Sequence, residues 1–193
     1  MKNILIVFLL VFFQSTTAQS TFEYDVVLTP VSVSGLPGLH SYAFAQHNGK
    51  WLIIGGRLDG IHARQPFNAF PASNNNDLIY VLDKANNQYW YASVNVLPNG
   101  LKEQLQSTNM NEVQVGDKLY ISGGYGFSPT ANDHITFPYL TEVNVSGLIN
   151  SIVNGSDISP NFIQISDNRF ALTGGNLGVI DSSFYLIGGH RFD

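Results

Sequence analysis

Cationic and aromatic side chains gather in two long loops of this sequence and at its C-terminal end. Seven of them form the candidate ligand-binding set: Arg57, His62, Arg64, Tyr125, His134, His190 and Arg191. Aromatic rings pack on the apolar faces of sugars, and arginine pairs with a carboxylate through two parallel hydrogen bonds. These residue types favour a carbohydrate or an acidic ligand. The alternative is that the rings pack the loops against neighbouring strands and the charges are solvated.

Four of the five histidines fall in or near the same loops, which suggests a metal site. His40, His62, His134 and His190 follow one another at intervals of 22, 72 and 56 residues, which match no compact ligand motif. The chain has no cysteine, so thiolate ligands and thiol catalysis are excluded within it. We therefore expect no metal and no cofactor, and we expect His47, before a hairpin turn, to be exposed.

Known catalytic patterns find no match in the chain. It has no Gly-x-Ser-x-Gly nucleophile elbow, and no paired carboxylates stand at a strand end. Its double glycines open onto loops rather than helices, so they do not form a phosphate-binding turn. We assign no catalytic residue, and a binding protein is favoured over an enzyme.

A repeat positions these loops. An apolar strand runs into a double glycine three times, at Gly55-Gly56, Gly123-Gly124 and Gly188-Gly189, with steps of 68 and 65 residues. The three strands are expected over 51–54, 119–122 and 184–187, each after a two-residue turn signal. Glycine lets backbones approach closely and permits positive φ where the chain leaves a strand. A regular repeat of this length predicts a repeated β architecture.

The rest of the pattern is nearly all strands. In the first unit, strands at 41–45, 77–83 and 88–94 join the one at 51–54 to make four antiparallel strands, as in a propeller blade. The second unit has strands at 108–115, 118–122, 140–145 and 161–165, with 148–153 read as a short helix or an irregular return strand. Long loops over 57–76 and 125–139 carry most of the candidate residues, and loops of that length are usually functional or disordered.

The repeated residues resemble the kelch family of β-propellers. In the first unit the double glycine is followed by Tyr80 and Trp90, with Asp83 at the turn between them. The second unit keeps its double glycine but has neither the tryptophan nor the aspartate. The chain also lacks the Trp-Asp dipeptide of the other common four-stranded repeat. The resemblance covers about 39–193 and implies an all-β propeller of four-stranded antiparallel blades.

The N-terminal residues and the repeats together predict a domain organisation for the whole chain. We expect a signal peptide at 1–18, then a partial propeller over 19–193: a closing outer strand within 22–33, a first blade at 39–95, a second at 105–160 and a truncated third at 162–193. Propellers have about four to eight blades. About two and a half blades would be an incomplete ring, the N-terminal part of a longer one. The alternative is a ring completed by several copies of the chain.

The first residues read as a secretory signal. Lys2 precedes an apolar stretch over 4–13, and the small residues at 16–18 suit a cleavage site before Gln19. About ten apolar residues are too few for a membrane-spanning helix, which needs about 20. We expect a protein that is secreted, periplasmic or on the cell surface, without a membrane span after cleavage; an uncleaved anchor is the alternative.

Charge and the resemblance together limit the partners. The 193-residue chain has a net charge of −5 with only 12% charged residues and no basic run, which argues against nucleic acid. We expect a module that binds a protein or a glycan through its long-loop face. A second hypothesis is a carbohydrate-active enzyme, because kelch propellers include copper-dependent sugar oxidases and sialic acid epimerases; the oxidases' Tyr–Cys cofactor cannot form in a chain without cysteine. A third is a truncated copy without independent function.

Overall fold

The computed structural model describes residues 24–30, 32–60 and 70–192. Its contacts divide the chain into two parts, an N-terminal part of residues 1–30 and a main part of residues 31–193. In the N-terminal part, residues 24–30 are exposed and form no helix or strand. The strand expected over 22–28, as the outer strand of a closing blade, is not formed by residues 24–28 here, so its pairing with such a blade stays a prediction. The expected signal peptide at 1–18 lies outside the described residues.

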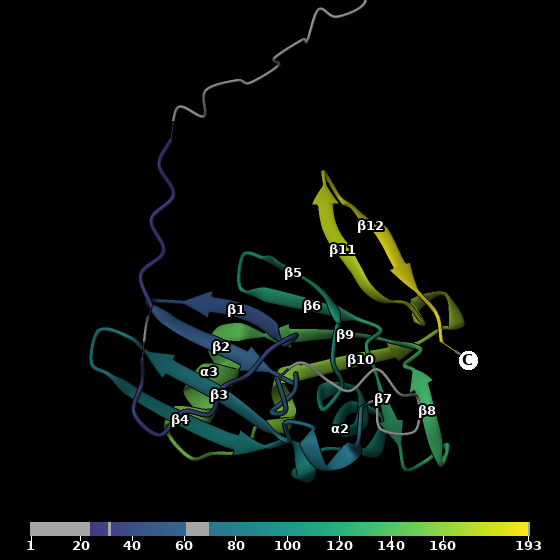
Figure 1. The fold of residues 1–193 in the computed structure, drawn as a ribbon, viewed down its shortest axis with the longest axis horizontal. Coiled ribbons are helices and arrows are strands. Elements are labelled where there is room, and N and C mark those ends of the chain that lie inside the picture. The colour runs from purple at the N-terminus through teal and green to yellow at the C-terminus, as the bar shows by residue number, and fades with distance from the viewer. Residues whose placement is uncertain (1–23, 31, 61–69, 193) are drawn as a thin grey trace, which may run out of the picture. The chain divides into compact units, whose positions relative to one another are not determined.

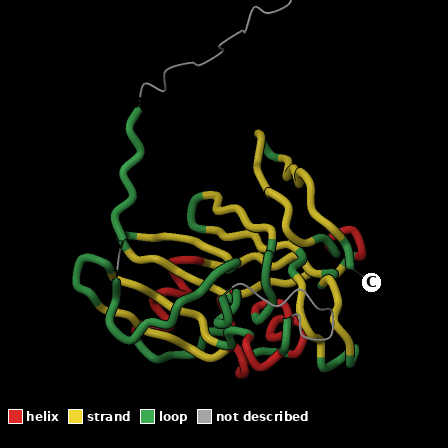
Figure 2. The backbone as a smooth tube through the Cα atoms, viewed as in Figure 1, coloured by secondary structure: helices red, strands yellow, loops and turns green. Residues whose placement is uncertain are grey.

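The main part, residues 31–193, is mostly β, and its first sheet has four antiparallel strands (Figures 1 and 2). In chain order they are β1 (Ala43–His47), β2 (Lys50–Ile54), β3 (Leu78–Asp83) and β4 (Gln88–Ser93). Asn48 and Gly49, between β1 and β2, both have positive φ, as the tight turn of a twisted hairpin requires. The four strands expected for the first unit are confirmed.

The second sheet also has four antiparallel strands, in the order β10-β9-β6-β5. They are β5 (Asn111–Val115), β6 (Lys118–Ser122), β9 (Tyr139–Asn144) and β10 (Phe162–Ser166). β10 pairs with β9 along its whole length, so the strand expected over 161–165 belongs to the second sheet, which extends to Ser166, beyond the blade boundary expected between 160 and 162. The segment left open at 148–153 belongs to helix α3 (Val145–Val153), whose first turn is capped by the Asn144 side chain.

The loop expected over 125–139 contains a hairpin. Its strands are β7 (Tyr125–Ser128) and β8 (Asp133–Thr136). Helix α2 (Asn99–Leu105) holds the hairpin, because the buried carboxylate of Glu103 accepts hydrogen bonds from the hydroxyls of Ser128 and Thr130, each at 2.5 Å. The remaining strands, β11 (Thr173–Ile180) and β12 (Ser183–His190), pair with each other as a separate hairpin. Four short 3-10 helices complete the described elements: η2 (Ala72–Asn74), η3 (Val94–Val96), η4 (Ser159–Asn161) and η5 (Asn168–Phe170).

The first strands of the three repeats, β1, β5 and β11, are neighbours. β5 contacts β1 on one side and β11 on the other. Gln114 of β5 bridges to β1 by accepting from the Gln46 backbone N–H and donating to its carbonyl, both at 2.9 Å. The double glycines connect the units as well: the Gly56 N–H donates to the Ser107 carbonyl at 2.9 Å, and the Gly124 N–H donates to the carbonyl of residue 172 at 3.3 Å.

The main core lies between the first two sheets and α3. It includes fully buried residues of β2, β3, β6 and α3, such as Leu52, Val81, Ile121 and Leu148. Trp90 packs against this core, and Tyr80 is buried in a second cluster with Ile53 and Leu82. Asp83, 3.4 Å from the Lys50 ammonium, accepts hydrogen bonds that order the β3–β4 turn. Among the described helices, none has the length and apolar character needed to cross a membrane.

Candidate functional site: an aromatic pocket beside the double glycines

The residue after each double glycine has the same place in its unit. Each pairs in antiparallel fashion with a residue near the start of its own sheet: His40 with Arg57, Thr108 with Tyr125, and Thr173 with His190. The steps between successive pairs are again 68 and 65 residues. Three members of the candidate set, Arg57, Tyr125 and His190, are therefore equivalent positions of the repeat.

A second repeated position follows the first. Ser41, Asn109 and Gly174 come directly after His40, Thr108 and Thr173, and their φ angles are 55°, 52° and 70°. Left-handed backbone favours glycine and tolerates asparagine better than most residues. The three units thus start with the same backbone conformation while carrying different side chains.

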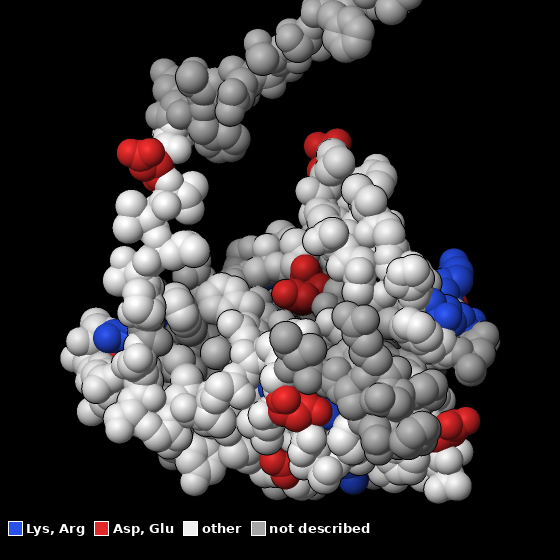
Figure 3. All heavy atoms as spheres, viewed as in Figure 1, with Lys and Arg blue, Asp and Glu red and all other residues white. Residues whose placement is uncertain are grey.

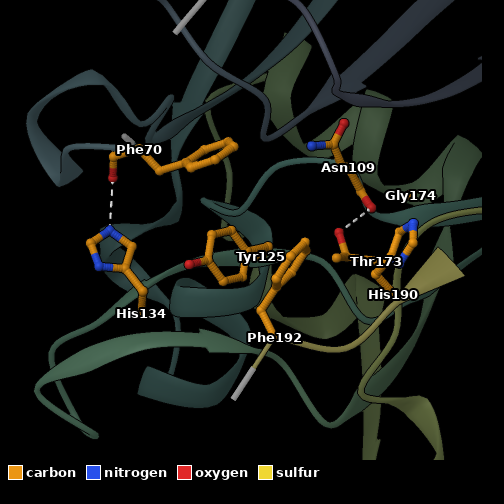
Figure 4. A pocket seen from close by; sticks show the side chains of 8 residues that line it. All are labelled: Phe70, Asn109, Tyr125, His134, Thr173, Gly174, His190 and Phe192. Carbon is orange, nitrogen blue, oxygen red and sulfur yellow. Dashed lines mark hydrogen bonds between the residues drawn. The ribbon is translucent and has the colours of Figure 1, made fainter. Parts of the chain in front are cut away.

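A pocket of about 410 Å³ lies between the second and third units at these positions (Figure 4). Its lining residues are Phe70, Asn109, Tyr125, His134, Thr173, Gly174, His190 and Phe192. Three of the seven candidate residues, Tyr125, His134 and His190, are brought together here. No Lys, Arg, Asp or Glu occurs among these described lining residues.

The aromatic rings of the pocket pack around Tyr125. Its ring centroid is 5.2 Å from that of Phe70 in an edge-on arrangement, 5.0 Å from that of Phe192 and 5.9 Å from that of His134. Figure 4 shows Phe70, Tyr125 and Phe192 close together, with Asn109, Thr173 and His190 across from them. Such contacts fix the rings in place, so their faces are organised before a ligand arrives.

Two polar groups of the pocket are committed to the protein. The His134 Nε2 is 2.9 Å from the Phe70 carbonyl, which can only accept, so this nitrogen donates. The Thr173 hydroxyl donates to the Asn109 carbonyl at 2.8 Å. Phe70 has a φ of 53°, an unusual conformation for a bulky residue, and the His134 hydrogen bond helps to hold it.

Three other polar groups remain available to a ligand. The Tyr125 hydroxyl, the Asn109 side-chain amide and the His190 ring make no hydrogen bond with any residue in the described part of the chain. Burial, and to a lesser extent the nearby charge of Asp133, raises the pKa of Tyr125, so its hydroxyl keeps its proton and donates. Together the three groups offer both donors and acceptors.

Arg57 supports the pocket from behind instead of lining it. Its guanidinium is almost fully buried and makes two hydrogen bonds to the Asp59 carboxylate, at 2.9 and 2.6 Å. These bonds lower the pKa of Asp59 from 3.8 to about 2. The guanidinium carbon lies 5.3 Å from the centroid of the Phe70 ring, a cation–π distance. Arg57, a member of the candidate set, is therefore not among the described residues that line this pocket.

The remaining candidate residues and His47 do not line the aromatic pocket among the described residues. His62 and Arg64 lie outside the described residues. Arg191 lines a smaller neighbouring pocket of about 200 Å³. His47 lies 3.2 Å from the Asp117 carboxylate and is half-buried, so it is less exposed than expected. Among the described residues, no group of three or more His, Cys, Asp or Glu is placed to hold a metal ion.

The sequence interpretation missed five lining residues: Phe70, Asn109, Thr173, Gly174 and Phe192. The repeat steps would have found two of them, because adding 68 and then 65 to Ser41 leads to Asn109 and Gly174. Nothing in the local pattern marks Phe70 or Phe192 as different from other loop aromatics. Comparison with known protein families and with curated proteins gives no match for this chain.

Proposed function

We propose that this chain is part of a secreted kelch-type β-propeller that binds a glycan in the aromatic pocket. Three features support the propeller: two four-stranded antiparallel sheets, first strands that neighbour one another, and double glycines that all have positive φ. Each double glycine also donates to the start of the next sheet in the first two units. These relations are the ones that successive blades around an axis would have.

The observation that carries the binding function is the combination of groups in the pocket. Aromatic faces suit the C–H surface of a sugar ring, while the Tyr125 hydroxyl, the Asn109 amide and the His190 ring suit its hydroxyls. A volume of about 410 Å³ is in the usual range of small-molecule sites. A neutral sugar ring is favoured because no carboxylate, guanidinium or ammonium occurs among the described lining residues.

Binding is favoured over catalysis at this site. Glycoside hydrolysis typically uses two carboxyl groups on either side of the scissile bond. No Asp or Glu lines the described pocket, and Asp59, the carboxylate held by Arg57, is already neutralised by that pairing. A glycan is favoured over a protein surface because the available polar groups face a concavity.

Gly174 offers a direct steric test of the pocket. A Cβ built there meets no atom within 4 Å, and asparagine already occupies the equivalent left-handed position at 109. Gly174→Asn should therefore fold normally while its side chain fills the pocket. Gly116→Asn is the matched control, because Gly116 also has positive φ and open space but lies in the β5–β6 turn.

We expect wild-type protein to bind members of a glycan array and to show millimolar or tighter affinity for them by calorimetry. Gly174→Asn should abolish this binding, and Gly116→Asn should leave it unchanged. Equal binding by both variants would overturn the assignment of the pocket. An array on which the wild type binds nothing would overturn glycan binding itself.

A further inference from the structure

Another pocket, the hairpin groove, lies between the second sheet and the β11–β12 hairpin. Its volume is about 350 Å³. Six of its lining residues are apolar: Leu140, Phe170, Leu172, Leu177, Phe184 and Leu186. The Phe184 ring lies edge-on against Tyr120 of the second sheet, with ring centroids 4.8 Å apart. The hairpin groove therefore has one apolar wall on each of two successive repeats.

The same repeat positions are closed between the first two sheets. Subtracting the repeat step of 65 from Phe184 and Leu186 gives Leu119 and Ile121. Both equivalents are 0% exposed, whereas Phe184 is 46% exposed. Helix α3 closes that first core, where it packs with Leu119 and Ile121 and contacts all four strands of the first sheet. Among the described residues, no helix takes the corresponding place in the hairpin groove.

The second sheet extends the groove with two exposed isoleucines. Leu140 pairs with Ile165 of β10, so their side chains lie on the same face of the sheet. Ile163, two residues earlier on β10, shares this face, and both isoleucines are exposed. In the first sheet the corresponding outer strand is β4, whose Trp90 packs against the core that contains α3. The open face of the second sheet is thus equivalent to the face that α3 covers on the first.

Charge plays no part in selecting what fills this groove. Figure 3 shows acidic atoms at the tip of the β11–β12 hairpin and no charged atoms along the face of its body. Asp181 is the only Asp, Glu, Lys or Arg in the hairpin sequence. On the sheet, Glu142 is paired with Lys118 at 2.6 Å. At the rim, Arg169 is paired with Asp167 at 2.7 Å. An apolar centre bordered by polar residues is typical of a protein–protein contact.

We propose that the hairpin groove binds an amphipathic α-helix of a partner protein, in the place that α3 has on the first sheet. The buried stripe of α3 shows what such a helix carries, because its apolar residues follow the spacing i, i+3, i+4 and i+7: Val145, Leu148, Ile149 and Ile152. A second copy of the chain is a poor source, since both α-helices of the described residues, α2 and α3, already bury side chains in their own chain. The groove and the aromatic pocket have different described lining residues, so this proposal is independent of glycan binding.

The test uses three designed peptides of about 18 residues, each with the same leucine, alanine, lysine and glutamate content. The first places its leucines at the α3 spacing. The second shuffles them so that a helix has no apolar stripe, and the third alternates leucine with polar residues, as suits a strand. Binding to the full chain is measured by fluorescence anisotropy, at a concentration where light scattering shows a monomer. We expect micromolar binding of the first peptide, at least about tenfold tighter than that of the other two.

Adjacent residues of β12 provide a matched pair of variants. Phe184 and Tyr185 are 46% and 49% exposed but point to opposite faces of the hairpin. Phe184→Ala should weaken binding of the first peptide by about tenfold or more, and Tyr185→Ala should leave it unchanged. Ile165→Lys tests the opposite wall and should also weaken binding, independently of how the hairpin packs.

Each contrary outcome overturns the proposal. Equal binding of the first two peptides, or no binding of any, would show that the groove does not accept a helix. Tighter binding of the alternating peptide would indicate an added strand instead. Binding that neither Phe184→Ala nor Ile165→Lys weakens would lie elsewhere on the chain. A wild-type dimer that Ile165→Lys dissociates would make a second copy the occupant. None of these results affects the glycan test with Gly174→Asn.

Discussion

At the scale of single residues, the pairing of Arg57 with Asp59 makes stability depend on pH. The hydrogen bonds from Arg57 lower the pKa of Asp59 to about 2, so the carboxyl binds a proton less readily in the folded chain than in the unfolded one. The stabilisation is therefore present above pH 3.8 and is lost as the pH falls towards 2. At neutral pH it amounts to about 2 kcal/mol.

We predict that Asp59→Asn lowers the free energy of unfolding at pH 7, by at least the amount of this stabilisation, because it also leaves a buried guanidinium without its counter-charge. Below pH 3 the difference from wild type should shrink as Asp59 itself becomes protonated. Urea unfolding at pH 7 and pH 2.5 measures both values. A difference that is the same at both pH values would show that the ion pair contributes nothing.

A second residue-scale prediction concerns Gln104, whose side chain is fully buried. Its amide nitrogen donates to the carbonyls of Gly123 and Tyr139, both at 3.1 Å, and its oxygen accepts from the Thr141 hydroxyl at 2.6 Å. Gln104→Leu keeps the volume but removes these hydrogen bonds, at about 1–3 kcal/mol for each buried group left unsatisfied, although the Tyr139 carbonyl still accepts from the Gly123 N–H. We expect a loss of about 3 kcal/mol or more in urea unfolding. Gln106→Leu, two residues later at the half-buried C-terminal cap of α2, is the control and should change stability by less than about 0.5 kcal/mol.

At the scale of elements, the first glycine of each pair allows three equivalent positions to be compared. A Cβ at Gly123 would lie 1.7 Å from a backbone carbonyl, and one at Gly55 would lie 2.6 Å from Met110 and 2.8 Å from the Ser107 carbonyl. A Cβ at Gly188 meets nothing within 4 Å. All three have positive φ, which alone costs an alanine about 1–2 kcal/mol.

We therefore predict a graded response to Gly→Ala at these positions. Gly188→Ala should lose only as much stability as the positive φ costs an alanine, and Gly55→Ala should lose more. Gly123→Ala should not reach a native state at room temperature. Thermal unfolding followed by circular dichroism measures the order. Three equal losses would mean that the glycines serve conformation alone and not the close approach of neighbouring sheets.

Sequence patterns predicted the elements best where local chemistry and tertiary structure agree. The Asn48-Gly49 turn and the double glycines require positive φ, so their neighbours were placed correctly. The β7–β8 hairpin was missed because its strands are only four residues long and the segment between them is rich in turn-forming types. The blade boundary expected between 160 and 162 separates β10 from its sheet, because sheet membership depends on pairing with β9, which α3 separates from β10 along the chain.

The site was predictable only in part for a similar reason. The repeat places Tyr125 and His190 at equivalent positions, so their type and spacing led to them. Arg57 looks the same in sequence, but Asp59 two residues later binds its guanidinium and removes it from the ligand face. Phe127 occupies the corresponding place after Tyr125, so the pairing has no counterpart in the second unit.

At the scale of residues 31–193 as a whole, the β11–β12 hairpin is less covered than the equivalent hairpins β1–β2 and β5–β6. β2 and β6 have a neighbouring strand on each side, whereas β12 pairs only with β11 within the described residues. Ile180, Phe184 and Ile187 of this hairpin are 62%, 46% and 73% exposed. An apolar strand with a free edge promotes association between molecules.

We predict that the isolated chain self-associates as its concentration rises, and that Ile187→Lys reduces this association. Light scattering coupled to size-exclusion chromatography gives the mass at each concentration. Val96→Lys is the control, since Val96 is 67% exposed but lies in η3, away from the hairpin. Equal masses for wild type and Ile187→Lys at every concentration would show that the hairpin does not drive association.

The position after each double glycine also has a consequence for how such a protein changes over generations. The backbone there is held by glycine and by a fixed bridge to the start of the sheet, yet the side chains in the three units are arginine, tyrosine and histidine. Selection can therefore exchange that side chain in one unit without disturbing folding in the others. New ligand preferences would be acquired by single codon changes, while the glycines before them are kept under purifying selection.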